Sequence, residues 1–150
     1  MATRSYTTRR QGIVDAIVDK LKAIDGSGNY HTDVMNNVSP RLKFWDEVEE
    51  FPAVHLNAGR EAREYLTGGV KNRFLTVTLR CYVNEEDAVN ALDALLEDVE
   101  TVLEDNSSMT YTDKLVVSQG IQQITVLSID TDEGVLEPMG VAEMVAEVRY

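Results

Sequence analysis

The chain has 150 residues, of which 43% are hydrophobic and 27% charged, and its 26 acidic against 14 basic residues give a net charge of −12 at pH 7. This length fits one domain, residues 1–150, and allows a sizeable core without disulfides or metals. So negative a chain is unsuited to sequence-independent DNA binding, which Lys and Arg drive, and to docking on anionic membranes. No stretch approaches the roughly 18 apolar residues of a membrane span, so we expect no membrane association.

Apolar residues recur at helical spacing over residues 7–24, which predicts an amphipathic helix capped by Thr7 or Thr8. The sequence "DGSGN" at 25–29 should end this helix, because a glycine can adopt the left-handed conformation found after a last helical turn. Residues 30–38 have weak strand character.

A β-hairpin is predicted next, from a strand at 51–58 and a second at 73–83, joined by "GREAREYLTGG". The second strand alternates strictly, so one of its faces should be buried. That face carries Leu75, Val77, Leu79, Cys81 and Val83. The joining segment carries far more charge than a turn needs, so it is either a solvated loop or a docking surface.

Residues 84–106 predict the clearest helix, with Asn84 as its cap and acidic residues in its first turn. Further acidic residues, Asp98 among them, crowd its later turns and read as a solvated face. A short strand at 114–118, a strand at 121–130 and a last strand at 140–150 complete the chain.

Strands joined by hairpins pair antiparallel, and two amphipathic helices can cover one face of the resulting sheet. We therefore expect an α+β fold with a mostly antiparallel β-sheet and two main helices packed on one face. The other face is half polar. The alternation of the last strand continues to Tyr150, so the C-terminus should belong to the sheet.

The sequence offers few residues suited to chemistry, and its many acidic residues single out no carboxylate pair. His31 and His55 lack metal-site spacing, and one cysteine leaves no structural zinc set. The run "SIDTDEG" lacks the calcium-loop pattern, and the glycine pairs lack phosphate-loop spacing. We expect no catalytic residues, no cofactor and no metal.

The remaining candidate function of the surface is contact with another protein, because Tyr and Arg are enriched at interfaces. The basic N-terminal segment can also contact the acidic surface of a neighbouring copy. The candidate subunit or partner interface consists of Arg60, Glu61, Arg63, Glu64, Tyr65, Arg9 and Arg10. The alternatives are a solvated loop at the hairpin tip and a mobile N-terminal tail.

Three stretches carry a family resemblance: "RRQGIVDAIVDKLKAIDGSGNYHTDV", "EEFPAVHLNAGRE" and "RFLTVTLRCYVNEEDAVNALDALLEDVETVLEDN". Their order resembles that of the tail terminator (tail completion) proteins of long-tailed bacteriophages. The resemblance implies a structural virion protein without enzymatic activity, located at the head-proximal end of the tail and assembled in the host cytoplasm.

Membership would imply a homohexameric ring that caps the tail tube, ends its polymerisation and offers a joining surface to the head. The partners implied are other copies of the chain, the tail tube protein and a head completion or connector protein. DNA would pass through the lumen without specific binding, which a charge of −12 suits. The alternatives are another head–tail connector or neck subunit, or a small acidic ligand-binding α+β protein or enzyme.

Overall fold

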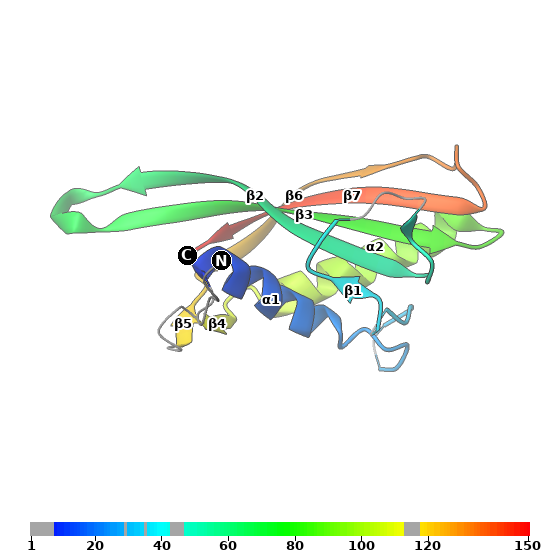
Figure 1. The fold of residues 1–150 in the computed structure, drawn as a ribbon, viewed down its shortest axis with the longest axis horizontal. Helices are drawn as coiled ribbons and strands as arrows, with labels where there is room; N and C mark the ends of the chain where they lie inside the picture. Colours follow the sequence, from blue (N-terminus) through cyan, green and yellow to red (C-terminus); the bar gives the residue numbers. More distant parts are fainter. Residues whose placement is uncertain (1–7, 29, 35, 43–46, 113–117) are drawn as a thin grey trace, which may run out of the picture.

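The computed structural model describes residues 8–28, 30–34, 36–42, 47–112 and 118–150. Two helices lie on the same side of a five-stranded sheet (Figure 1), as the sequence predicted. In spatial order the sheet consists of β1 (Val38–Ser39), β2 (Ala53–Tyr65), β3 (Lys71–Asn84), β7 (Met139–Arg149) and β6 (Gln123–Thr131). The β1–β2 contact is parallel and the other pairings in this sheet are antiparallel.

Helix α1 spans Arg9–Leu21, and the Thr8 hydroxyl caps it by accepting a hydrogen bond from the Gln11 amide at 3.2 Å. The prediction that the glycines end this helix is wrong. Lys22 already forms the C-cap, and Gly26 and Gly28 adopt their positive φ in the following loop. Among the described residues of 30–38, only Val38 belongs to a named strand, so the predicted strand there is mostly loop.

Helix α2 spans Ala88–Asp105 and begins later than predicted. Asp87, not Asn84, is the N-cap, and no side chain makes a capping hydrogen bond there. The acidic residues Glu85 and Glu86 therefore precede the helix instead of lying in its first turn.

One acidic residue of α2, Asp98, is buried, and the prediction of a solvated position is wrong for it. Its carboxylate accepts hydrogen bonds from the His31 amide at 3.0 and 2.9 Å, the Thr32 amide at 2.8 Å and the Thr32 hydroxyl at 2.6 Å. These bonds hold the loop after α1 against α2.

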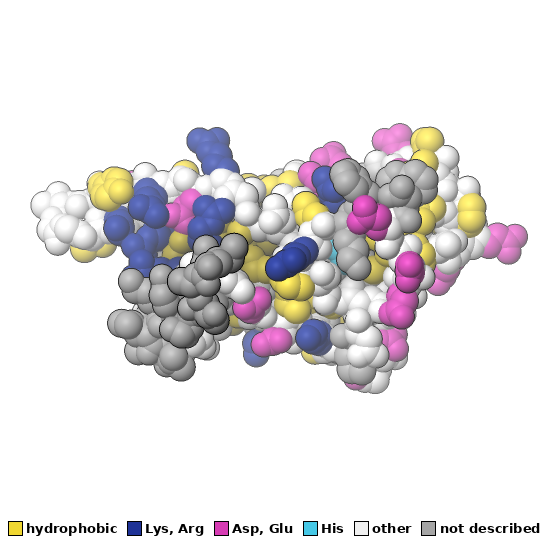
Figure 2. Space-filling model, in the orientation of Figure 1, with side chains coloured by type: hydrophobic (Ala, Val, Ile, Leu, Met, Phe, Trp, Pro, Cys, Tyr) yellow, Lys and Arg dark blue, Asp and Glu magenta, His cyan; other side chains and the backbone are white. Residues whose placement is uncertain are grey.

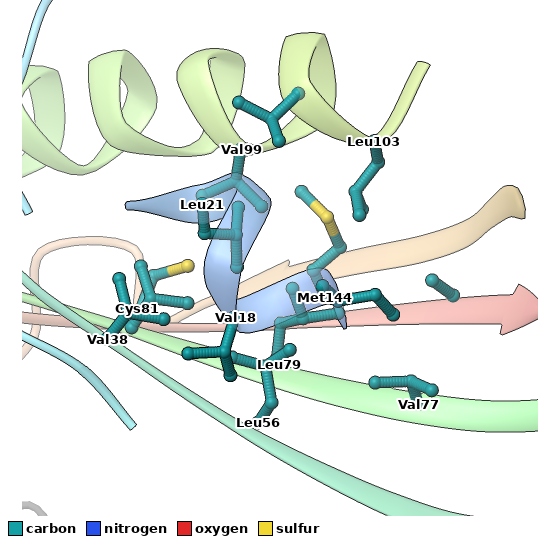
Figure 3. Packing of buried hydrophobic residues seen from close by; sticks show 14 of the residues in the cluster. Val18, Leu21, Val38, Leu56, Val77, Leu79, Cys81, Val99, Leu103 and Met144 are labelled. Carbon is teal, nitrogen blue, oxygen red and sulfur yellow. The ribbon is translucent and has the colours of Figure 1, made fainter. Parts of the chain in front are cut away.

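The core lies between the helices and the inner face of the sheet (Figure 3). It includes the predicted inward face of β3, together with the apolar stripes of α1 and α2. Labelled members in the figure are Val18, Leu21, Val38, Leu56, Val77, Leu79, Cys81, Val99, Leu103 and Met144. On the opposite face of β3, Tyr82 is also buried, with its ring 5.3 Å from that of His55.

The C-terminal strands follow the prediction closely. β6 and β7 form an antiparallel pair, and the backbone of Tyr150 continues the pairing by exchanging hydrogen bonds with Arg73. A separate two-stranded sheet joins β4 (Thr110–Thr112) to β5 (Ser118–Gly120). Except for Ser118, the short strand predicted at 114–118 falls outside the described residues.

The β2–β3 hairpin extends well past the body of the molecule (Figure 1), because its strands are 13 and 14 residues long. We call residues 59–75 the arm. The charged stretch expected in the turn lies mostly within β2, and the connection is limited to residues 66–70 around the 3-10 turn Thr67–Gly69. The excess charge therefore belongs to an exposed strand.

Candidate functional site

A β-bulge in β2 marks the point where the arm leaves the body. Ala58 pairs with Val77 and Glu61 with Leu75, so two residues of β2 face one residue of β3. The guanidinium of Arg10, at the start of α1, donates hydrogen bonds to the carbonyls of Ala58 and Gly59. Helix α1 is thereby tied to the base of the arm.

Glu61 lies at the centre of this base, with a side chain only 7% exposed. Its carboxylate accepts hydrogen bonds from Arg63 Nε at 2.8 Å and from the Tyr150 hydroxyl. Burial raises the pKa of Glu61, but these hydrogen bonds and the nearby cations outweigh burial, so the pKa is lower than usual. Burial, and next the hydrogen bond to Glu61, raise the pKa of Tyr150, so its hydroxyl keeps the proton that it donates.

Tyr150 braces the arm from the body side. Its backbone amide donates to the Arg73 carbonyl at 3.0 Å, and the Arg73 amide donates to the Tyr150 carbonyl at 3.2 Å. The Arg73 guanidinium lies 5.5 Å from the centre of the Tyr150 ring, and Tyr111 packs against that ring edge-on at 6.0 Å. Backbone, hydroxyl and ring of the last residue thus all hold the base of the arm.

Basic side chains gather around the base of the arm (Figure 2), although the chain as a whole is strongly acidic. The cluster comprises Arg9, Arg10, Arg60, Arg63, Arg73 and Arg149, and Lys71 adds a further cation near the tip, where it pairs with Tyr65. Some of these residues line an open cavity of about 310 Å³. The only acidic residue in its lining is Glu61, whose charge Arg63 already balances. This end of the molecule therefore carries positive charge on its surface.

The tip of the arm is apolar and exposed. Tyr65 is 70% exposed, Leu66 45% and Val70 56%. The turn closes with a hydrogen bond of 2.7 Å from the Leu66 amide to the Val70 carbonyl. Exposed apolar groups beside cations are typical of contact surfaces between proteins.

The predicted interface residues fall into two groups. Arg9, Arg10, Glu61 and Arg63 line the cavity at the base of the arm. The other three, Arg60, Glu64 and Tyr65, are exposed along the arm itself. Glu61 points into the base and not outward, so its visible role is to position the arm.

Sequence reasoning missed Lys71, Arg73 and Tyr150 as parts of this site. The alternation of the last strand put Tyr150 in the sheet, but no local pattern shows that β7 reaches the base of the arm. The basic cluster is likewise assembled from three separate parts of the chain, namely α1, the hairpin and the end of β7.

Clusters of metal-ligating side chains and reactive thiols would mark a site for chemistry in the described part of the chain. No group of three or more His, Cys, Asp or Glu residues there could hold a metal ion. Burial raises the pKa of the Cys81 thiol to about 12, which leaves it protonated and a poor nucleophile. None of the described helices is long and apolar enough to span a bilayer.

Comparison with known proteins gives a consistent result. Residues 7–150 match the family model described as Bacteriophage Tail Tube Terminator Protein. The chain is 32% identical over 149 residues to the tail tube terminator protein of Escherichia phage T5, with 94% of this chain and 92% of the relative covered. A chain of the virion of a native gene transfer agent particle has a similar fold, with a TM-score of 0.57 at 10% identity over 92% of this chain and 93% of that one.

The segment matched by the family model includes every described residue, and so it contains the arm, both helices and the sheet. The sequence resemblance is therefore confirmed: the chain belongs to the tail tube terminator proteins of bacteriophages, a family of structural virion components and not a class of enzymes.

Proposed function

We propose that the chain, as one domain of 150 residues, forms a homohexameric ring at the head-proximal end of a phage tail tube. The ring ends polymerisation of the tube and offers the surface to which the head is joined. Family membership over residues 7–150 is the observation that carries this proposal. The role is structural and not catalytic, which agrees with membership of a family of structural virion proteins.

The arm is the contact that we assign to assembly. Arg60, Arg63, Glu64 and Tyr65 are exposed along a strand that protrudes from the body. Arg and Tyr contribute heavily to protein–protein binding energy, because they combine large contact area with directed hydrogen bonds. An exposed edge strand presents unpaired backbone N–H and C=O groups with which another chain can pair, so the length of the arm favours a partner.

The partners that we assign are other copies of the chain, the tail tube protein and a head completion or connector protein. DNA passes through the lumen of the ring without specific binding. The net charge of −12 supports this point, because a negatively charged channel repels the phosphate backbone.

Two measurements test the proposal. Light scattering after size-exclusion chromatography should give a mass near six times 16.8 kDa, either for the protein alone or after incubation with tail tubes. Negative-stain images should show the protein at one end of each tube, and tubes treated with it should stop growing. A monomer that leaves both the mass and the growth of the tubes unchanged would contradict the proposal.

A matched pair of variants probes the arm. Replacing Arg60, Arg63 and Tyr65 together by alanine should leave the circular dichroism spectrum intact and weaken assembly. Replacing the exposed Lys20 of α1 and the C-cap residue Lys22 by alanine should leave both the spectrum and assembly unchanged. Loss of the folded spectrum in the arm variant would instead show that the arm supports the core.

A further inference from the structure

The two ends of the molecule carry opposite charge. Lys and Arg gather around the base of the arm, and Asp and Glu gather at the opposite end (Figure 2). The sequence explains this separation: residues 84–112 and 118–148 contain no Lys or Arg. These segments supply α2, β6 and nearly all of β7, so the end that they form has no cation of its own.

The acidic end is a defined surface, made by the start of α2 and the turn between β6 and β7. The Glu85 amide donates a hydrogen bond of 3.0 Å to the Pro138 carbonyl, which fixes the two segments together. A Cβ on Gly134 would approach Val89 of α2 to 3.1 Å, so the turn packs closely on the helix. The two segments therefore pack together and form one continuous surface.

This surface combines apolar residues with acidic ones. Val89 is 42% exposed, Val135 81% and Leu136 41%. Around them lie the exposed acidic residues Glu85, Glu86, Asp87, Asp93, Glu133 and Glu137. The arm has the matching arrangement, with Tyr65, Leu66 and Val70 at its tip and cations behind them.

From this match we propose that the arm of one copy docks on the acidic end of a second copy. The apolar residues of the two surfaces meet, and the cations of the arm face the carboxylates around the start of α2. Charge complementarity selects the partner surface, because an arm facing another arm would bring cations together.

The contact is head-to-tail, because the two surfaces are different and lie at opposite ends of the molecule (Figure 1). A contact of this kind leaves one free arm and one free acidic end at each step, so copies continue to add until the rotation closes a ring. The inference rests on the proposed ring and names the surfaces that its subunits share.

Charge reversal on each surface tests the pairing. Arg60→Glu with Lys71→Glu reverses the arm, and Glu86→Lys with Asp93→Lys reverses the acidic end. Each pair alone should raise the protein concentration needed for half-maximal ring formation about tenfold or more, the effect of losing roughly one favourable contact. The variant with all four changes should assemble like the wild type, because complementarity is restored.

Controls carry the same change of charge elsewhere. Lys20→Glu with Lys22→Glu, at the end of α1, is the control for the reversed arm. Glu104→Lys with Asp105→Lys, at the far end of α2, is the control for the reversed acidic end. Both should assemble normally. Circular dichroism confirms that every variant compared is folded.

Three outcomes would overturn the inference. In the first, a variant with only one reversed surface assembles as the wild type does. In the second, the variant with all four changes is folded but does not assemble. The arm variant could also fail only on tail tubes while self-association persists, which would assign the arm to the tube protein. If the wild type neither assembles nor stops tube growth, the proposed function itself is wrong.

Discussion

Replacing the buried Asp98 by alanine should destabilise the protein more than replacing any of the exposed acidic residues of α2. The carboxylate is 1% exposed and accepts hydrogen bonds from the amides of His31 and Thr32 and from the Thr32 hydroxyl, at 2.6 to 3.0 Å. A hydrogen bond to a charged acceptor contributes about 1.5–3 kcal/mol, and the freed donors regain only part of this from water. We expect a loss of about 3–5 kcal/mol in the free energy of unfolding.

Urea denaturation at neutral pH, followed by circular dichroism, measures this loss. The matched control is Glu97→Ala on the neighbouring residue, whose side chain is 72% exposed and lies 3.4 Å from His31 Nε2. An exposed ion pair contributes little, so the control should cost less than about 1 kcal/mol. If Asp98→Ala costs no more than its control, the loop after α1 is not held by this carboxylate and the reasoning fails.

Three further predictions concern the base of the arm and the packing of α1. Tyr150→Phe removes the hydroxyl that donates to Glu61 and should cost about 1–2 kcal/mol of unfolding free energy, with faster proteolysis of the arm. Unchanged values would show that this hydrogen bond does not stabilise the fold. The pKa of Glu61 is lowered in the folded chain, so its stabilisation is complete above the ordinary value of 4.5 and is lost as pH falls through the folded pKa. Urea titrations at neutral and at acidic pH should therefore show a larger loss on acidification for the wild type than for Glu61→Gln, and equal losses would contradict this. Gly12→Ala places a Cβ 2.5 Å from the Thr112 carbonyl and should lower the melting temperature despite the better helix propensity of alanine, whereas Gly120→Ala, with nothing within 4 Å, should not.

The sequence predicts the fold best where burial imposes a period. β7 alternates along its whole length and β3 from Leu75 to Cys81, because one face of each packs on the helices, and both their positions and their inner faces are confirmed. The same holds for the apolar stripe of α2. The charged part of β2 has no such signal, because residues 62–65 are exposed on both faces and only their pairing with β3 makes them a strand.

The site itself could be predicted only in part, because its contacts join distant parts of the chain. Glu61 and Tyr150 are separated by 89 positions, and Asp98 lies 66 and 67 positions from its partners Thr32 and His31. Nothing local distinguishes Asp98 from the solvated acids around it. The charged, aromatic segment with Arg60, Arg63 and Tyr65 led to the prediction of a contact surface, and the structure places these residues on an exposed strand.

The way in which the arm joins the body has a mechanical consequence. β3 runs without a break from the tip of the arm into the centre of the sheet, where β2 and β7 flank it on either side. A pull along the arm would load the hydrogen bonds of both neighbouring ladders in shear, all at once, and not one after another as in peeling. A force applied at the tip of the arm would therefore pass directly into the centre of the sheet.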